Sequence, residues 1–392
     1  MKKKILILGG GSGDVGRDVT RILLTDRKIV DNLTVTSRNL AIAKEFVNCL
    51  KDDRINPEKL DVTDIPNLMR VIKDHDLIVN TVGPFYRYTI PIIKAAIEKK
   101  VDYIDICDDI EPTWEALQLD SFAKKAGISV LLCMGWFPGM SNLRAKALSE
   151  QMDKVEEVVT AWVLGKKAAD DEPSYGMAGT EHFIRALTRE IVSFRNGHRV
   201  KIPAFHEGLK LKFPKPLGPY ICYQLEHPEP VTLPYVISGI KTASNLGSLY
   251  PPNRNKFIRL LTRAIDFRLI SFKMANTILE ILSKNRSTKT FFPKMIGSYI
   301  ALIGTKNGEK GQLRYSSTNT CVTTAEATSQ SLVCAIFNNL TNNKIKPGVH
   351  LPETAIEIND LINIGIKLKL PFFTEAIEET IWTKEIDSMA EN

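Results

Sequence analysis

The sequence comprises 392 residues, of which 44% are hydrophobic and 25% are charged, a balance typical of a soluble globular protein with two or three domains. Its formal net charge is +7, which is too weak to indicate nucleic-acid binding by itself, so we expect no nucleic-acid partner. No apolar run reaches the roughly 18 residues that span a bilayer. We therefore expect a soluble protein without a membrane partner.

The six cysteines form no CxxC pair, and several of them lie in apolar runs. This pattern predicts reduced, buried thiols rather than a disulfide framework or a zinc site. The histidines and acids also lack the spacing of metal ligands, so no metal is expected. We expect the protein to be cytoplasmic.

Residues 1–143 alternate strand patterns with helical patterns. The helical patterns show apolar residues on one face, as in residues 15–25. Short strands separated by helices of ten or more residues predict parallel βαβ units. The sequence thus predicts an α/β protein whose N-terminal domain is a Rossmann-type, doubly wound parallel sheet. The predicted strands are residues 3–8, 32–37, 55–62, 76–82, 102–107 and 128–134.

Residues 144–320 show a different pattern of predicted elements. Residues 156–165 alternate like a half-buried strand, and two hairpin patterns centre on Asn196-Gly197 and Asn307-Gly308, pairs that favour tight turns. We expect an inserted α+β domain, an antiparallel sheet plus helices, that serves substrate binding and dimerisation. Between the hairpins, residues 254–286 hold eight Lys or Arg and two acids. We interpret this run as a solvated basic helical face, with a subunit contact or a site for an acidic ligand as alternatives.

Residues 321–392 are predicted to form a C-terminal helical segment that returns to the first domain. Thr323 and Glu326 have the spacing of a capping box in front of an apolar helix.

The stretch "GGGSGDVG", residues 9–16, raises the first functional question. A P-loop needs Gly-Lys-Ser/Thr at its end, but Arg17 and Asp18 follow Gly16. The dinucleotide fingerprint G-x-G-x-x-G fits in one register, Gly11-Gly13-Gly16, between a predicted strand and helix. In this register Gly11 permits a tight turn, Gly13 lets the backbone approach a pyrophosphate, and Gly16 allows close helix packing. A structural glycine turn is the alternative. Ser12, Asp14 and Val15 complete the expected cofactor loop, with the Asp14 side chain pointing away from the phosphates.

The end of the second predicted strand discriminates between cofactors. NAD enzymes offer an acid to the ribose 2′-hydroxyl at this point, whereas this sequence has Ser37 and Arg38. A hydroxyl and a guanidinium suit a 2′-phosphate. The sequence therefore predicts NADP (NADPH) as the cofactor.

Ligands of doubly wound sheets bind beyond the carboxyl ends of the strands. The loops expected at this edge carry the remaining candidates, several of them polar or aromatic residues near loop tips. Predicted cofactor contacts are Asp61, Val62, Thr81, Val82, Gly83, Pro84, Cys107 and Asp108, and predicted substrate contacts are Tyr86, Trp136, Gly139, Met140, Ser141 and His182.

Several stretches resemble the saccharopine dehydrogenase-like family, which includes saccharopine reductases, lysine 6-dehydrogenases and carboxynorspermidine synthases. The resemblance covers most of the chain. It is carried by "ILILGGGSGDVGRDV", "VNTVGPFYRYTIPIIKAAIEKKVDYIDICDD", "GWFPGMSNL", "SFRNGHRVKIPAF", "YQLEHPEPVTLPY" and "KPGVHLPE".

The resemblance implies hydride transfer between NAD(P)H and a carbon–nitrogen bond of an amino-acid or amine substrate, commonly in a homodimer. Such chemistry needs a proton donor for the nitrogen, and the catalytic candidates are Tyr86, Asp108 and His227. Two alternatives are a non-catalytic NADP-binding sensor or scaffold, and a reductase of an apolar lipid-like substrate that uses the basic helices at a membrane surface.

Overall fold

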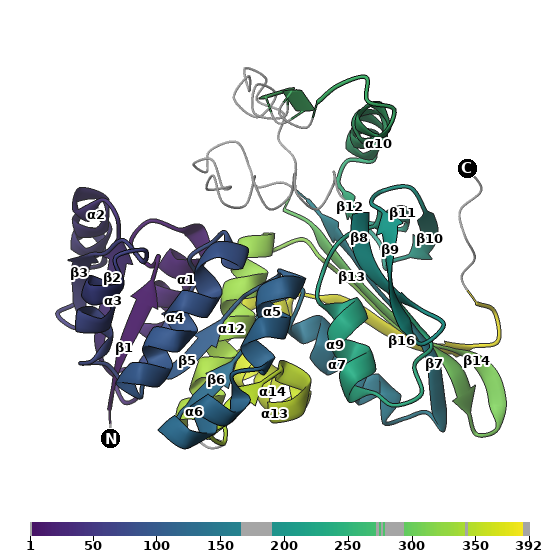
Figure 1. Ribbon diagram of the computed structural model, residues 1–392. Helices are drawn as coiled ribbons and strands as arrows, with labels where there is room; N and C mark the ends of the chain where they lie inside the picture. The colour runs from purple at the N-terminus through teal and green to yellow at the C-terminus, as the bar shows by residue number, and fades with distance from the viewer. Residues whose placement is uncertain are drawn as a thin grey trace. The chain divides into compact units, whose positions relative to one another are not determined.

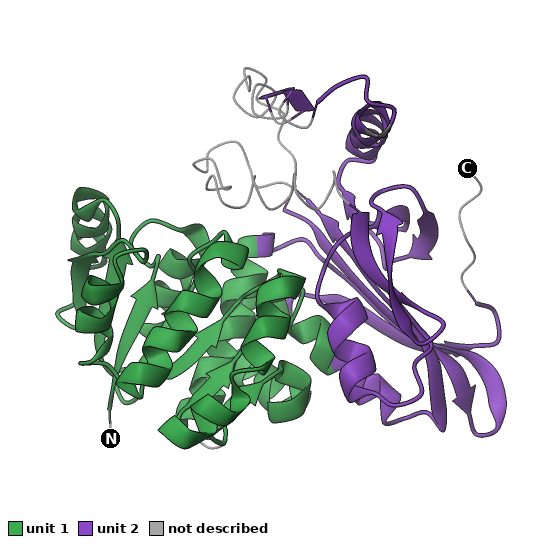
Figure 2. Ribbon diagram, in the orientation of Figure 1, with its two compact units in different colours: residues 1–143, 325–374 green, residues 144–324, 375–392 purple. Residues whose placement is uncertain are grey.

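The computed structural model describes residues 2–165, 190–271, 274–275, 277–278, 294–341 and 344–386. The chain divides into two compact units (Figure 2). Unit 1 comprises residues 1–143 and 325–374, and unit 2 comprises residues 144–324 and 375–392.

Unit 1 contains a sheet of seven parallel strands in the order β15-β6-β5-β4-β1-β2-β3 (Figure 1). The chain builds outward from β1 through β2 and β3, then returns to the other side of β1 with β4. This reversal confirms the predicted doubly wound fold. The strands are β1 (Lys3–Leu8), β2 (Val30–Ser37), β3 (Ile55–Lys59), β4 (Leu77–Asn80), β5 (Asp102–Asp105), β6 (Ser129–Leu131) and β15 (Gly348–His350).

Helices cover both faces of this sheet. The helices α3 to α6 pack on one face around a core that includes Leu6, Ile78 and Tyr103. Two helices, α5 and α6, connect β5 to β6. The helices of the first chain segment are α1 (Asp14–Leu23), α2 (Leu40–Leu50), α3 (Ile65–Ile72), α4 (Phe85–Lys99), α5 (Ile110–Leu117) and α6 (Asp120–Ala126).

The C-terminal part of unit 1 supplies α12 (Thr324–Thr341), α13 (Pro352–Ala355), α14 (Ile358–Lys367) and α15 (Pro371–Thr374). The helix α12 begins near the carboxyl edge of the sheet, where Thr328 lies close to Gly135. It ends at the amino edge, where Leu340 lines a pocket with Lys3. This long helix is largely buried, as its apolar sequence predicted.

Unit 2 contains a mixed sheet along the path β10-β11-β12-β7-β13-β14-β16, with β8 and β9 attached through β12. The pair β12–β7 is parallel, so the sheet is not wholly antiparallel as predicted. Both predicted hairpins are present, with positive φ at Asn196, Gly197, Asn307 and Gly308. The strands are β7 (Lys154–Leu164), β8 (Glu190–Arg195), β9 (His198–Pro203), β10 (Gly208–Lys212), β11 (Pro219–Gln224), β12 (Thr242–Leu249), β13 (Ile296–Lys306), β14 (Glu309–Asn319) and β16 (Ile377–Thr383).

The prediction of a helical segment for residues 321–392 was wrong at residues 377–383. Residues 377–383 form β16, which pairs with β14 in unit 2. The hydroxyl of Tyr315 donates to Glu378 (2.6 Å), and Arg314 pairs with Glu379 (3.1 Å). These cross-strand polar contacts require residues far apart in sequence, so the local pattern could not indicate them.

Three helices accompany unit 2: α7 (Met140–Ser149), which spans the boundary between the units, α9 (Glu229–Val236) and α10 (Asn253–Asp266). No helix among the described residues combines the length and apolar character needed to cross a bilayer.

Candidate functional site

The loop after β1 is built from glycines at the carboxyl edge of the sheet. Its left-handed residue is Gly9 (φ +81°), so the tight turn assigned to Gly11 lies two residues earlier than predicted. A Cβ on Gly11 would stand 2.7 Å from the Cβ of Ala43. Gly11 therefore allows α2 to approach, and its amide donates to the carbonyl of Thr36 (3.1 Å).

The other two fingerprint glycines differ in what surrounds them. A Cβ on Gly16 would stand 2.8 Å from both the Cα of Gly10 and the Oγ1 of Thr81, so Gly16 lets α1 pack closely against the strands. A Cβ on Gly13 would meet only the carbonyl oxygen of Gly9, at an ordinary 3.4 Å. The protein itself does not require a glycine at position 13, which is consistent with an approaching ligand.

The first turn of α1 follows the glycine loop directly in the chain. Gly13 is its N-cap residue and supplies no side-chain hydrogen bond. The amino end of a helix attracts anions through its N–H groups and its dipole. Burial raises the pKa of nearby Asp18. The charges of Glu326 and Asp14 also raise it, whereas Arg21 lowers it. Asp14 is the first helical residue, and Asp18 in the next turn pairs with Arg21 (2.7 Å).

The ends of β2 and β3 lie next to each other. The Ser37 side chain is buried, and its Oγ accepts from the amide of Asn39 (3.1 Å). Two hydrogen bonds from Thr63 lower the pKa of Asp61, and the positive charge of the exposed Arg38 lowers it further. An exposed guanidinium at the end of β2 is placed to pair with an anion there.

A buried polar network joins the ends of β4, β5 and β6. Asn80 donates to the hydroxyl of Tyr103 (2.9 Å), which donates to Asp105 (2.9 Å). The other oxygen of Asp105 accepts from the amides of Cys107 (3.1 Å) and Cys133 (2.8 Å). Burial raises the pKa of Asp105 to about 6, although these hydrogen bonds oppose the rise. The network fixes where three of the site's loops leave the sheet.

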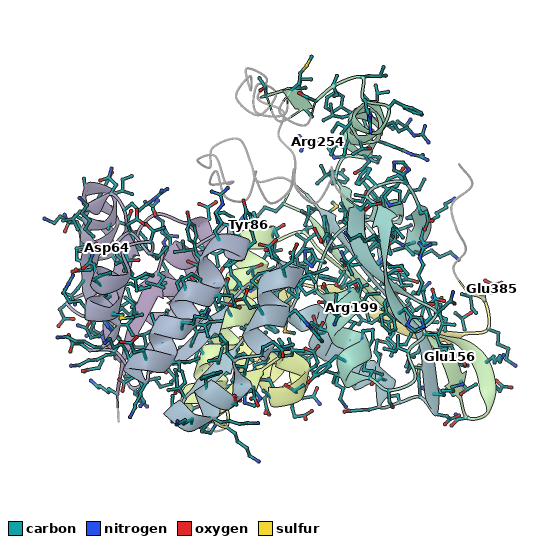
Figure 3. The ribbon with its side chains drawn as sticks, in the orientation of Figure 1. Asp64, Tyr86, Glu156, Arg199, Arg254 and Glu385 are labelled. Atoms are coloured by element: carbon teal, nitrogen blue, oxygen red, sulfur yellow. The ribbon has the colours of Figure 1, made fainter. Side chains whose placement is uncertain are left out.

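Asp109 joins two of these loops. Its Oδ2 accepts from the amide of Tyr86 (2.9 Å). Tyr86 lies at the start of α4 and is labelled in Figure 3. The half-buried Asp108 is its neighbour in the chain, and the Gly83-Pro84 turn precedes Tyr86. The Cys107 side chain, by contrast, is fully buried, with its sulfur near the Oγ1 of Thr113 (3.7 Å). Cys107 can therefore offer a ligand only its backbone.

The loop after β6 departs from the prediction. The side chains of Trp136, Met140 and Ser141 are buried rather than loop tips. Asn142 accepts from the Gly139 amide (3.2 Å) and donates to Glu353 (2.9 Å). Gly139 is required for packing, since a Cβ there would stand 2.3 Å from the carbonyl oxygen of Gly135. The stretch "GWFPGMSN" thus forms a tightly packed corner of the fold.

His227 belongs to unit 2, and the sequence did not reveal its partner. Its Nδ1 lies 2.9 Å from the Oε2 of Glu229, and both side chains are buried. Its ring centroid is 6.1 Å from that of Trp162. The carboxylate holds the imidazole with a proton on Nδ1, which leaves Nε2 for other partners. His182 lies outside the described residues.

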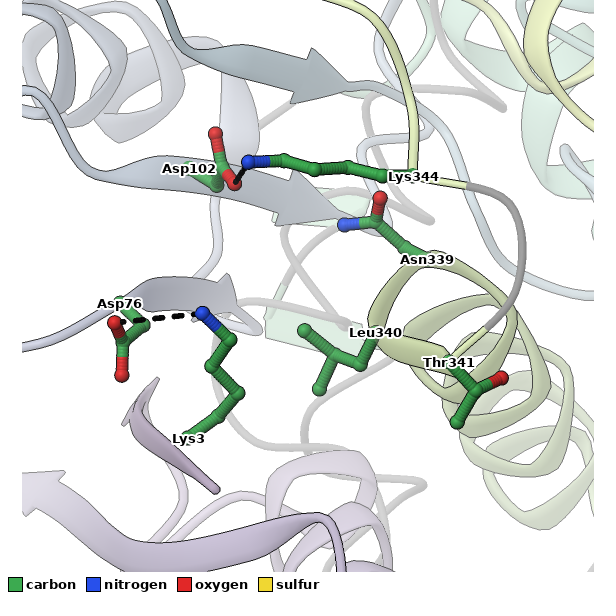
Figure 4. A pocket seen from close by; sticks show the side chains of 7 residues that line it. All are labelled: Lys3, Asp76, Asp102, Asn339, Leu340, Thr341 and Lys344. Carbon is green, nitrogen blue, oxygen red and sulfur yellow. Dashed lines mark ion pairs between the residues drawn. The ribbon is translucent and has the colours of Figure 1, made fainter. Parts of the chain in front are cut away.

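A pocket of about 160 Å³ lies at the opposite, amino edge of the unit 1 sheet (Figure 4). Two ion pairs line it, Lys3–Asp76 (3.7 Å) and Lys344–Asp102 (3.8 Å). Because ligands of such sheets bind at the carboxyl edge, we do not assign this pocket to the cofactor.

Residues 5–131 match the family model described as the saccharopine dehydrogenase NADP binding domain. Unit 1 carries an NADP-binding domain of the saccharopine dehydrogenase type. The predicted resemblance and the predicted cofactor are both confirmed by this match. The described residues fit a dinucleotide with a 2′-phosphate, because bare backbone at Gly13, the first turn of α1 and exposed Arg38 lie at one edge of the sheet.

Parts of the chain are also similar to curated proteins. The chain is 25% identical over 250 residues to a carboxynorspermidine synthase from Vibrio cholerae serotype O1, covering 57% of this chain and 58% of the relative. It is 33% identical over 150 residues to the saccharopine dehydrogenase [NADP(+), L-glutamate-forming] of Pyricularia oryzae, covering 38% of this chain and 31% of that protein. The matches thus span less than two thirds of the relatives' lengths.

The fold is shared over nearly the whole chain. The solved structure of apo histidine-tagged saccharopine dehydrogenase (L-Glu forming) from Saccharomyces cerevisiae superposes with a TM-score of 0.70 at 18% identity, covering 97% of this chain and 100% of that one. At this identity the likeness concerns the architecture of the NADP-binding domain and the mixed-sheet unit, not the reaction.

Substituting the two loop glycines separates folding from cofactor binding. Gly16→Ala is expected to lower the free energy of unfolding by about 1–3 kcal/mol, because its Cβ would clash with backbone. Gly13→Ala is expected to leave that free energy nearly unchanged and to weaken NADPH binding by about tenfold or more. Thermal unfolding with and without NADPH checks both. Unchanged NADPH affinity in Gly13→Ala would contradict this placement of the pyrophosphate.

Charge reversal at the end of β2 tests the cofactor preference. Arg38→Asp is expected to weaken NADPH binding by about tenfold to a hundredfold, because a charge-assisted hydrogen bond is replaced by repulsion. NADH binding should not weaken. Arg27→Asp is the matched control, since Arg27 is an exposed cation that precedes β2 at the amino edge. Equal losses for NADPH and NADH would argue against a 2′-phosphate contact.

Asp105 predicts a pH dependence of stability. The native carboxyl has its pKa at about 6 rather than its ordinary 3.8, so the folded chain holds this proton more tightly than the unfolded chain. Its stabilising contribution is fully present below about pH 4 and is lost as the pH rises to about 6, by at most about 3 kcal/mol.

Urea unfolding of the wild type and Asp105→Asn between pH 4 and pH 8 measures this effect. The wild-type free energy of unfolding should fall relative to that of the variant as the pH rises from about 4 to about 6. Parallel pH profiles would show that Asp105 titrates alike in the folded and unfolded chains.

Proposed function

We propose that the protein is an NADP-dependent oxidoreductase that transfers hydride to or from a carbon–nitrogen bond of an amino-acid-like substrate. The type of the NADP-binding domain and the activities for which the relatives are named support this reaction class. The observation that carries the proposal is the hydrogen bond from the Tyr86 amide to Asp109 (2.9 Å). It holds two acid–base candidates, Tyr86 and Asp108, at the same sheet edge as the glycine loop.

The reaction sets clear requirements for the protein. NADPH, when bound, supplies the hydride that adds to the imine carbon. The imine nitrogen must then receive a proton from a positioned side chain. Asp108 is the candidate acid of unit 1, and the phenol of Tyr86 is the second candidate at the same edge.

His227 is the candidate acid of unit 2. Its hydrogen bond to Glu229 (2.9 Å) fixes the ring and its tautomer, an arrangement that suits a group that donates and regains a proton through Nε2. Donation through Nε2 would leave the neutral imidazole, and the carboxylate of Glu229 would keep the remaining proton on Nδ1 until Nε2 is reprotonated.

A screen of NADPH oxidation and NADP reduction tests the reaction class. The substrates are lysine, saccharopine, diamines with aspartate semialdehyde, and keto acids with amines. Turnover that depends on an amine or imine supports the proposal. Tight NADP binding without turnover on any of them would instead support the sensor alternative.

Three substitutions test the acid–base assignments. Asp108→Asn or His227→Gln is expected to lower kcat by about a hundredfold or more if that residue donates the proton, with NADPH affinity kept. Tyr86→Phe tests the phenol in the same way. The glutamine at position 227 can still donate to Glu229, so it avoids leaving a buried carboxylate unpaired.

The matched controls are Asp74→Asn and His198→Ala, which remove an exposed acid and an exposed histidine elsewhere. Both should keep wild-type kcat. Unchanged kcat in all three test variants would reject these donor assignments.

A further inference from the structure

The helix α10 and the residues just after it expose large apolar side chains. Leu260, Phe267 and Leu269 are 68%, 74% and 75% exposed, and Phe257 is 40% exposed. Scattered single apolar residues are normal on protein surfaces, whereas several on one short segment indicate an interaction site. Arg254 marks the start of this helix in Figure 3.

The helix is anchored to unit 2 by its opposite face. Asn255 accepts from the amide of Leu249 and donates to its carbonyl, both at 2.8 Å, which fixes the start of α10 to the end of β12. Ile258 and Leu261 are buried. The exposed apolar side chains are therefore held outward by a helix that already has a packed inner face.

Cations lie among these apolar side chains. Lys256, Arg263 and Arg268 are exposed and make no ion pair with any described residue. Arg259, by contrast, lies over the ring of Tyr223 (5.6 Å) on the packed side. Residues 253–271 contain five Lys or Arg and one acid. The surface formed by the seven exposed residues, here the α10 patch, thus combines apolar contacts with uncompensated positive charge: Lys256, Phe257, Leu260, Arg263, Phe267, Arg268 and Leu269.

We propose that the α10 patch docks the protein on an anionic lipid surface. A helix with Phe and Leu beside Lys and Arg is the composition of an interfacial helix, whose apolar side chains enter the boundary between headgroups and acyl chains. Anionic headgroups attract the three cations at the same time. The docking is peripheral and does not rest on the reaction proposed above, since none of the seven patch residues is among the acid–base candidates Tyr86, Asp108 and His227.

Charge argues against a second copy of the chain as the occupant. A two-fold contact places the same patch on both partners, so two copies of a cationic surface would come together, with one acid per segment to offset the cations. Like charges across an interface disfavour that contact. An anionic surface removes the repulsion and still covers the apolar side chains.

Flotation of the full chain with extruded vesicles tests the proposal. The protein should float with vesicles of phosphatidylcholine and phosphatidylglycerol and remain behind with phosphatidylcholine alone. Lys256→Glu/Arg263→Glu/Arg268→Glu is expected to lower partitioning by more than about a hundredfold, since each cation near an anionic surface contributes roughly fivefold. Leu260→Ser/Phe267→Ser/Leu269→Ser should also abolish flotation.

Matched variants elsewhere keep the test specific. Lys28→Glu/Lys125→Glu/Lys310→Glu makes the same charge change at exposed sites outside the patch, and Phe122→Ser removes a phenylalanine that is 60% exposed on α6. Both should float as the wild type does, and circular dichroism checks that every variant is folded. Equal losses in the two charge triples would overturn the proposal.

Analytical ultracentrifugation tests the alternative occupant, which is a second copy of the chain. If the wild type is a dimer that ignores vesicles, and the serine triple is a monomer, the patch is a self-contact and the proposal fails. Flotation that persists in both patch triples would also overturn it.

Discussion

The carboxyl edge of the parallel sheet depends on one buried carboxyl group. Asp105 sits at the end of β5 and accepts hydrogen bonds from the chain that leaves β5 and from the chain that leaves β6. Through Tyr103 it also reaches Asn80 at the end of β4, whose side chain accepts from the amide of Val82 (3.0 Å). Removing a carboxyl group from water is costly, and these hydrogen bonds offset part of that cost. Three loops are thereby fixed relative to the glycine loop.

Much of the fold followed from local pattern because its signals are local. The strand before the glycine loop, the helix after it and the two Asn-Gly hairpins each need only a few neighbouring residues. The residues Asn307 and Gly308, for example, adopt the positive φ values that a tight hairpin turn requires. Sequence also indicated the cofactor, because Arg38 replaces the acid expected at the end of β2.

What the sequence missed depends on partners far along the chain. The strand β15 has three residues and exists because β6 offers it a free edge. Glu353 lies more than 200 positions from Asn142, yet the two side chains form a buried hydrogen bond (2.9 Å). The packing role of Gly11 was missed for the same reason, since it is Ala43 on α2 that requires a bare Gly11. Glu229 is the exception: it lies two residues from His227, and an acid so close to a candidate histidine was a usable signal.

The two charged features of the molecule differ in how salt should act on them. At the end of β2, the predicted partner of Arg38 is a single phosphate beside a glycine loop, where backbone N–H groups and shape would also contribute to nucleotide binding. The cations of the α10 patch are exposed, and their attraction to the proposed anionic surface would act over about one Debye length, so added salt should screen it strongly. In the sequence, the local excess of positive charge was interpreted as a solvated face. The exposed apolar residues beside it favour the proposed lipid contact instead. Charge alone would keep such a helix in water. The hydrophobic effect, by contrast, favours removal of the exposed Leu260, Phe267 and Leu269 side chains from water.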